Sequence, residues 1–227
     1  MKHITDIFFD LDHTLWDFDK NSEITYSIIF NKLDLAVDLS EFLRAYKQIN
    51  LDLWKLFRND LIDKETLRYK RLHDTFKAIN LTVTDGVIYT IADEYVYHLS
   101  QQTHLLDGAL ALLDYLKPKY KLHIITNGFA EVQVGKLKNT NLDAYFDVVI
   151  NSEMAGVKKP NPIIFEKALQ MANAPKENSL MIGDSYEADV LGALNYGIEA
   201  ICYNYHNETL PNHIHHVNHL EELIQIL

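Results

Sequence analysis

Short apolar runs alternate with helical patterns along most of this 227-residue chain. Each run is only a few residues long and ends in a polar or glycine-containing turn, as buried strands of a parallel sheet do. The predicted strands are Ile4–Phe9, Leu122–Ile125, Val148–Ile150, Leu180–Ile182 and Ile198–Tyr203. The predicted helices between them are Gly108–Leu116, Glu131–Lys138, Pro162–Met171 and Glu187–Asn195. This alternation predicts an α/β fold with a Rossmann-like, doubly wound parallel sheet.

Residues 17–102 interrupt the alternation. They contain one glycine and no proline, and they show little strand pattern. The helices predicted here are Asn21–Leu35, Ser40–Arg58 with Ser40 as its N-cap, Lys64–Ile79 and Asp85–Ser100. A segment of this length exceeds an ordinary crossover between strands. We therefore expect residues 17–102 to form an inserted all-helical domain, and residues 1–16 with 103–227 to form the α/β core.

The composition limits the classes of partner. Lys and Arg number 21 against 32 Asp and Glu, a net charge of −11, which argues against binding a nucleic-acid polymer. The single cysteine, Cys202, cannot form an internal disulfide, which favours the cytoplasm. Asp10 and Asp12 break the N-terminal apolar run, so we expect neither a signal peptide nor a membrane span. We expect a soluble protein, monomeric or weakly dimeric, that acts on a small molecule.

Polar side chains follow four of the predicted strands at their carboxyl ends. Parallel α/β sheets bind ligands at this edge. In chain order these segments are Asp10-Leu11-Asp12-His13-Thr14, Thr126-Asn127-Gly128, Lys159-Pro160, and Gly183-Asp184-Ser185 with Asp189 five residues after Asp184. We therefore expect carboxylates, hydroxyls and a lysine to meet at one edge of the sheet.

These residue types suit phosphoryl transfer. Asp10 and Asp184 offer the hard oxygen ligands that Mg²⁺ prefers. A carboxylate can attack phosphorus, and a second one two residues away can serve as general acid and base. Thr126 and the N–H groups of its turn can hold phosphate oxygens, while Lys159 offsets their charge. Because the protein is acidic, an anionic substrate needs a local positive centre such as a metal ion.

The four segments resemble the motifs of the haloacid dehalogenase-like superfamily, in the expected order and framing nearly the whole chain. The motifs are DxDxT from Asp10, a Thr/Ser turn at Thr126, Lys-Pro at Lys159 and GDxxxxD from Gly183. The resemblance implies that Asp10 is the nucleophile and Asp12 the acid/base. It also implies Mg²⁺ bound by Asp10, Asp184 and the backbone carbonyl of Asp12, and phosphate bound by Thr126, Asn127 and Lys159. The supporting residues it implies around them are Thr14, Ser185 and Asp189, and the helical insert is similar to the family's type-one cap.

The branch of the family is indicated by Asp12 and by the aromatic residues that follow it. Dehalogenases of the family typically lack Asp at this position, so Asp12 favours hydrolysis of a phosphate ester. The aromatic run Leu15–Phe18, together with the all-helical insert, resembles the corresponding parts of the nucleoside 5′-monophosphate phosphatase branch. Phosphatases of sugar phosphates or phosphoglycolate, a phosphomutase, a dehalogenase and a receiver phosphorylated on Asp10 remain alternatives. Trp16 and Phe18 have two alternative roles: they either pack at the hinge or stack against the substrate.

Histidines crowd the C-terminal end of the chain: His206, His213, His215, His216 and His219. Their spacing matches no zinc motif, so we expect solvated loop residues ahead of a final helix, Leu220–Leu227. His13 lies inside the first motif, where the family often has Gly, Asp or Asn, and its role is open. Asp189 either stabilises the helix that begins at Glu187 or supports the site, and Ser185 either caps that helix or belongs to the site.

Overall fold

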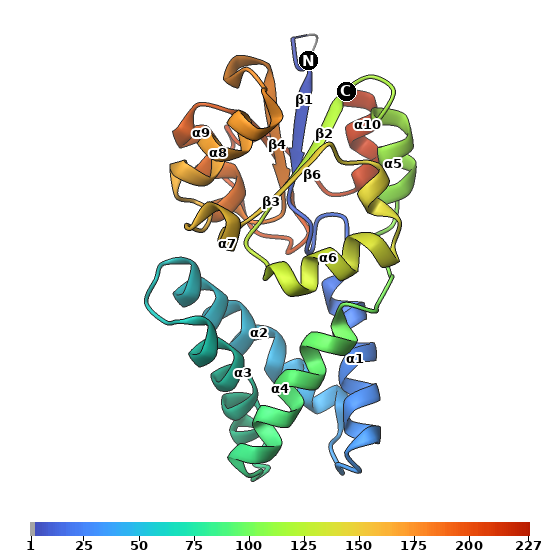
Figure 1. Ribbon diagram of the computed structural model, residues 1–227, viewed down its shortest axis with the longest axis vertical. Coiled ribbons are helices and arrows are strands. Elements are labelled where there is room, and N and C mark those ends of the chain that lie inside the picture. The colour runs from blue at the N-terminus through green and yellow to red at the C-terminus, as the bar shows by residue number, and fades with distance from the viewer. Residues whose placement is uncertain (1–2) are drawn as a thin grey trace. The chain divides into compact units, whose positions relative to one another are not determined.

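The computed structural model of the protein describes residues 3–227, which divide into two compact units (Figure 1). The α/β unit comprises the chain up to Phe18 together with residues 103–227. The helical unit comprises residues 19–102. The first border thus falls two residues later than the sequence pattern suggested, and the second falls at the same position.

The α/β unit contains a parallel sheet with six strands among the described residues, in the order β3-β2-β1-β4-β5-β6. The strands are β1 (Asp6–Phe9), β2 (Lys121–Thr126), β3 (Val148–Asn151), β4 (Ser179–Gly183), β5 (Glu199–Tyr203) and β6 (His216–Val217). This order confirms the predicted doubly wound fold. From β1 the chain adds β2 and β3 on one side of the sheet and then β4, β5 and β6 on the other. The strand order therefore switches between β1 and β4, and such sheets bind ligands at this switch point.

Strand β6 was not expected. It pairs with β5 in parallel, with Cys202 opposite His216. His216 is therefore a strand residue and not a loop residue as predicted. A strand of two residues has no period to recognise, so only its pairing with β5 reveals it.

Helices flank the sheet on both faces. They are α5 (Ala109–Leu116), α6 (Ala130–Asn139), α7 (Ser152–Ala155), α8 (Pro162–Ala172), α9 (Gly192–Tyr196) and α10 (Leu223–Ile226), with 3₁₀ turns at 142–144, 176–178 and 220–222. Figure 1 shows α8 and α9 on one side of the sheet and α5 with α10 on the other. Where a single α-helix was predicted from Glu187, the chain forms a π-helical segment, η3 (Tyr186–Leu191), that leads into α9. The final helix is likewise divided between a 3₁₀ turn and α10.

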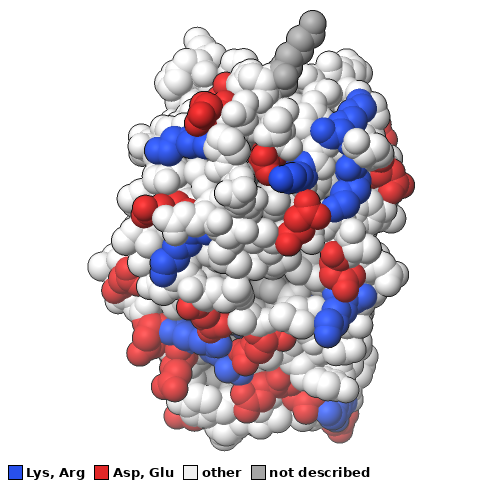
Figure 2. Space-filling view, turned by 45° about the horizontal axis from the view of Figure 1, so that its top comes forward, with Lys and Arg blue, Asp and Glu red and all other residues white. Residues whose placement is uncertain are grey.

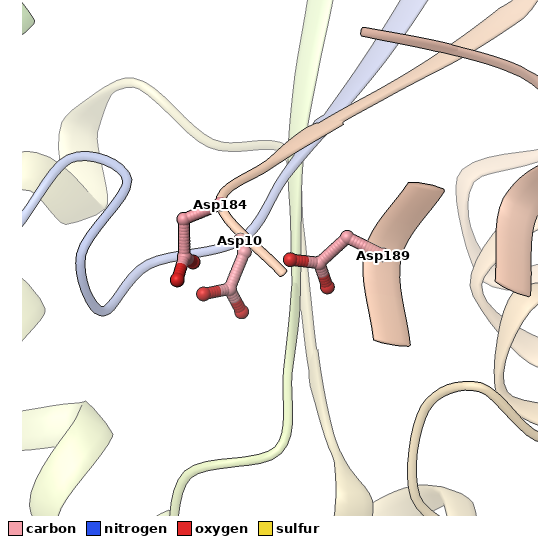
Figure 3. Close-up of side chains that lie close together, drawn as sticks. All are labelled: Asp10, Asp184 and Asp189. Atoms are coloured by element: carbon pink, nitrogen blue, oxygen red, sulfur yellow. The ribbon is translucent and has the colours of Figure 1, made fainter. Parts of the chain in front are cut away.

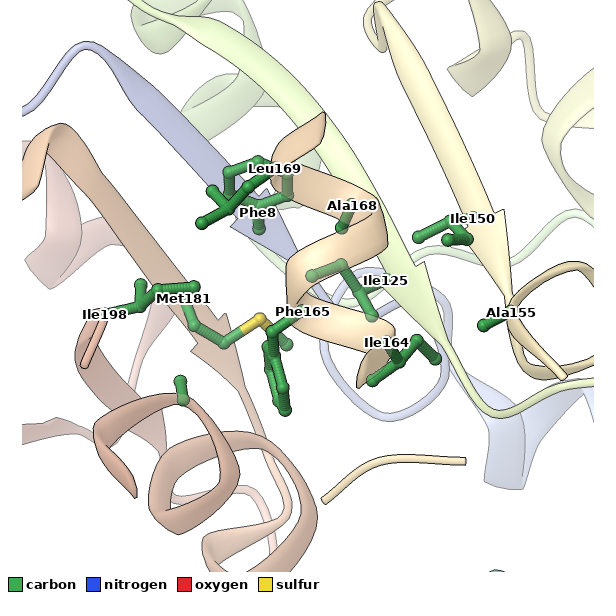
Figure 4. Close-up of a cluster of buried hydrophobic side chains, with 11 residues drawn as sticks. Phe8, Ile125, Ile150, Ala155, Ile164, Phe165, Ala168, Leu169, Met181 and Ile198 are labelled. Atoms are coloured by element: carbon green, nitrogen blue, oxygen red, sulfur yellow. The ribbon is translucent and has the colours of Figure 1, made fainter. Parts of the chain in front are cut away.

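The main apolar core of the α/β unit lies between α8 and the sheet (Figure 4). Phe165 and Ile164 of α8 are fully buried there, together with Phe8, Ile125 and Met181 from three strands. Each such side chain contributes about 1.5–3 kcal/mol when it leaves water. This packing holds the ends of β1, β2 and β4 in a fixed position, and these are the strands that carry the polar turns.

The helical unit contains four helices among residues 19–102, the first of which begins one residue earlier. They are α1 (Phe18–Lys32), α2 (Leu39–Arg58), α3 (Lys64–Ala78) and α4 (Asp85–Leu99). Ser40 is not the N-cap of α2, contrary to prediction. Asp38 takes that position, since its carboxylate accepts a hydrogen bond from the Glu41 N–H at 2.9 Å. Asp and Ser are equally good caps, so sequence alone did not separate them.

Acidic and basic side chains are intermixed on the face of the protein drawn in Figure 2, which shows no continuous basic surface. In the described part of the chain, no helix has the length and apolar character needed to cross a membrane.

Candidate active site

The carboxyl ends of β1 and β4 place two aspartates side by side. Phe9 is opposite Ile182 in the register of these strands, and the N–H of Asp10 donates to the carbonyl of Ile182 at 2.9 Å. Asp10 and Asp184 follow directly after the two strands. The sheet therefore brings together the first and last motifs, as their positions at strand ends predicted.

Three carboxylates form the centre of the site. Oxygens of Asp10, Asp184 and Asp189 all lie within 4.8 Å of one another. Figure 3 shows the Asp189 carboxyl group pointing toward Asp10. Burial raises the pKa of Asp10, and the charges of Asp189 and Asp184 raise it further while Lys159 opposes them. Crowded hard oxygen donors of this kind fit a divalent cation such as Mg²⁺, which relieves the repulsion between them.

Lys159 reaches this cluster from the loop between α7 and α8. Its Nζ lies 2.5 Å from Oδ1 of Asp10 and 2.7 Å from Oδ1 of Asp189, and it donates to the Ile125 carbonyl at 2.6 Å. Burial would lower the pKa of the ammonium group, but the two carboxylates outweigh burial and raise it. Lys159 is therefore a buried permanent charge beside Asp10.

Asn127 holds the backbone of Lys159. Its Oδ1 accepts from the Lys159 N–H at 2.7 Å, and its Nδ2 donates to the Lys159 carbonyl at 3.0 Å. The side chain of Asn127 thus fixes the backbone of Lys159 through both of its polar atoms. Thr126, at the end of β2, is 1% exposed, and its Oγ1 accepts from the Gly128 N–H at 3.0 Å.

Thr14, Ser185 and Asp189 surround these groups. Thr14 Oγ1 donates to Oδ1 of Asp184 at 3.1 Å and accepts from the Asp184 N–H at 3.1 Å. Ser185 caps η3 through Ala188, and its N–H donates to Oδ2 of Asp189 at 3.0 Å. Asp189 therefore contacts Lys159 from inside the π-helical segment, which a role in helix stabilisation alone would not require.

His206 lies at the site, contrary to the prediction that the C-terminal histidines are solvated loop residues. Its Nε2 is 3.0 Å from Oδ2 of Asp184. Burial opposes ionisation of Asp184, yet His206 and the nearby His13 hold the pKa of that carboxyl below its ordinary value. His206 follows β5 by three residues, so the strand-end rule applied to the fifth strand would have found it. The four other histidines of the C-terminal group are exposed.

His13 belongs to an aromatic group at the same edge of the sheet. Its ring centroid is 5.1 Å from that of His206, 5.0 Å from Tyr205 and 4.9 Å from Phe18. Phe18 and Trp16 are both buried, at 8% and 0% exposure. Their burial supports the packing interpretation of these two residues.

Two residues that the sequence pattern did not single out contact Asp12. Lys136 Nζ lies 2.5 Å from Oδ1 of Asp12, and Gln133 Nε2 donates to Oδ2 at 2.9 Å. Gln133 Nε2 also donates to Thr126 Oγ1 at 2.8 Å. Both residues are buried on α6, the helix that follows the Thr126 turn. The available signal was their i, i+3 spacing on one face directly after that turn.

A family model and known proteins match most of this chain. The family model described as haloacid dehalogenase-like hydrolase matches residues 6–197. The chain is 37% identical over 212 residues to "Pyrimidine 5'-nucleotidase PynA" of Streptococcus pneumoniae, covering 91% of this chain and 86% of that protein. It is 33% identical over 230 residues to "Pyrimidine 5'-nucleotidase YjjG" of Escherichia coli, covering 97% and 96%.

Solved structures share the fold. The crystal structure of the putative hydrolase YfnB from Bacillus subtilis, described as bound to magnesium, has a TM-score of 0.87 and 25% identity and covers 98% of each chain. A dehalogenase has a TM-score of 0.76 at 19% identity, which shows the fold alone. The family model spans most of the chain, and the two nucleotidases exceed 30% identity over nearly all of it. The chain belongs to the haloacid dehalogenase-like hydrolase family.

Proposed function

We propose that this protein is a Mg²⁺-dependent phosphate monoester hydrolase that acts through an aspartyl-phosphate on Asp10. The observation that carries the proposal is the position of Asp10, which is buried beside Lys159 and Asp184, with a second carboxylate, Asp12, two residues away. A nucleophile, a permanent cation and an acid/base group then stand at one strand end.

The reaction has two displacements. A carboxylate oxygen of Asp10 attacks phosphorus in line, and the bond to the leaving oxygen breaks as Asp12 gives that oxygen a proton. Asp12 then removes a proton from water, and the water oxygen attacks the phosphorus of the aspartyl-phosphate. The bond between phosphorus and the Asp10 oxygen breaks, so that orthophosphate leaves and the Asp10 carboxylate is restored. The Thr126 hydroxyl, the Asn127 N–H and Lys159 bind the phosphate oxygens.

The residues fit a magnesium ion. Asp10 and Asp184 would hold it through their carboxylates, oxygens of which lie within 4.8 Å of each other and of Asp189. The backbone carbonyl of Asp12 would be the third protein ligand. When bound, Mg²⁺ supplies positive charge that offsets the phosphate and draws an anion to an acidic protein. The contact of Asp189 with Lys159 supports a role for Asp189 in fixing the lysine.

We infer that the substrates are nucleoside 5′-monophosphates, with pyrimidine nucleotides preferred. The names of the two relatives at 37% and 33% identity support this choice. A "Glyceraldehyde 3-phosphate phosphatase" of Pyrococcus furiosus, 32% identical over 90% of this chain, keeps sugar phosphates as the second candidate. A cap role for the helical unit, a cytoplasmic location and a monomeric or weakly dimeric state remain predictions.

A substrate panel tests the proposal. Purified protein is assayed with the 5′-monophosphates of uridine, cytidine, thymidine, adenosine and guanosine and with glyceraldehyde 3-phosphate, each with Mg²⁺ or excess EDTA. We expect phosphate release only with Mg²⁺ and fastest from pyrimidine nucleotides. A preference for glyceraldehyde 3-phosphate would reject nucleotides as the substrate class but would leave phosphate ester hydrolysis as the reaction. Full activity in EDTA would reject the dependence on Mg²⁺.

A further inference from the structure

Both carboxylate oxygens of Asp12 are held by one helix. Lys136 Nζ contacts Oδ1 at 2.5 Å and Gln133 Nε2 contacts Oδ2 at 2.9 Å, and both residues come from α6. The Lys136 and Gln133 residues are 2% and 1% exposed, so each is fixed by its surroundings. A carboxylate has about four acceptor positions, and these two contacts therefore leave room for a transferred proton.

Gln133 also orients the hydroxyl group of Thr126. Thr126 Oγ1 accepts from Gln133 Nε2 at 2.8 Å and from the Gly128 N–H at 3.0 Å. A hydroxyl oxygen has two acceptor lone pairs, and both are occupied here. The hydroxyl group can therefore accept no further hydrogen bond and can only donate one. A phosphate oxygen, which is an acceptor, requires such a donor.

Gly128 and Trp16 keep these two side chains in place. A Cβ at Gly128 would lie 2.0 Å from Nε2 of Gln133, so only glycine leaves space for the amide group. Lys136 Nζ lies 4.1 Å from the centroid of the buried Trp16 ring, a cation–π contact that limits its movement. Gly128 therefore fixes the position of the Gln133 amide, and Trp16 fixes that of the Lys136 ammonium group.

We propose that Gln133 and Lys136 are positioning residues that hold the Asp12 carboxylate where it meets the leaving oxygen, and that Gln133 also turns the Thr126 hydroxyl toward the phosphate. The inference rests on the proposed function, and it adds two residues of α6 to the machinery. A displacement of about 1 Å at such a group costs up to about 10²-fold in rate. The loss should fall on substrates whose leaving oxygen needs a proton.

The test compares two esters in Gln133→Met and Lys136→Met. In uridine 5′-monophosphate the leaving group is the basic 5′-alkoxide of uridine, which needs a proton from Asp12, whereas p-nitrophenyl phosphate has the good leaving group p-nitrophenolate. Because kcat/KM covers the steps through phosphorylation of Asp10, the ratio of kcat/KM for the nucleotide to that for the nitrophenyl ester should fall by about tenfold to a hundredfold. The exposed Lys138 lies on the same helix, and Lys138→Met should leave the ratio unchanged.

A second variant and the form of the readout keep the test decisive. Gly128→Ala displaces the Gln133 amide without removing it and should lower the same ratio. The ratio does not depend on the fraction of folded protein, so a purely structural loss leaves it unchanged. If the wild type is active and kcat/KM of the variants falls equally for both esters, this inference is overturned and the proposed function stands. A wild type that hydrolyses neither ester overturns the proposed function and the inference together.

Discussion

Gly183→Ala should destabilise the protein through the contact between Lys159 and Asp189. A Cβ at Gly183 would lie 2.3 Å from Oδ2 and 2.5 Å from Cγ of Asp189, where ordinary contacts begin at 3.4 Å. The Asp189 carboxyl group must therefore move by about 1 Å in a close-packed interior. That movement breaks its 2.7 Å contact with Nζ of Lys159.

The size of the loss follows from what Lys159 retains. Removing one partner of a buried ion pair costs about 3–5 kcal/mol, because the other charge stays buried without compensation. Gly183→Ala separates the two charges without removing either, and Lys159 keeps Asp10 and the carbonyl of Ile125, so we expect the lower limit, about 3 kcal/mol. Hydrolysis should fall as well, since the displaced carboxylate no longer fixes the lysine beside Asp10.

Urea unfolding of the wild type, Gly183→Ala and a matched variant measures this loss. Gly86 lies in α4, where an added Cβ finds its nearest atom 3.9 Å away. Gly86→Ala should therefore raise the free energy of unfolding, by about 0.5–1 kcal/mol, because alanine is the better helix residue. A loss below about 1 kcal/mol in Gly183→Ala would refute the reasoning, since the carboxylate would then have moved without cost.

Three further outcomes are expected. Asp184→Ala should abolish the stimulation of hydrolysis by Mg²⁺, and a Mg²⁺ titration equal to that of the wild type would contradict the ligand assignment. Asp12→Asn should accumulate a phosphate adduct with p-nitrophenyl phosphate, seen by intact mass after acid quench, whereas Asp10→Asn should show none; an adduct on Asp10→Asn would move the nucleophile elsewhere. Burial lowers the pKa of His123, so the folded state resists protonation, and stability present above about pH 6.5 should decline as the pH falls below it. The free energy of unfolding, measured in urea at pH 7.5 and 5.5, should show this decline. A decline of equal size in His123→Phe would show that protonation of His123 is not its cause.

The edge of the sheet that carries the site was predictable from the sequence. Parallel strands share one polarity, so residues at or directly after the carboxyl ends of β1, β2 and β4 must meet at one edge. The positions of Asp10, Thr126 and Asp184 follow from that rule alone. The helical pattern predicted for residues 17–102 was equally readable, because a period of 3.6 residues is a local property of the chain.

Tertiary structure decided which side chains touch. Gln133 and Lys136 lie 121 and 124 residues from Asp12 in the sequence, and His206 lies 22 residues from Asp184. A buried polar helix face shows the same pattern as a solvated one, so their contacts depend on the rotation of α6 and the path of the loop after β5. Those are set by packing against the sheet, which no local period of the sequence encodes.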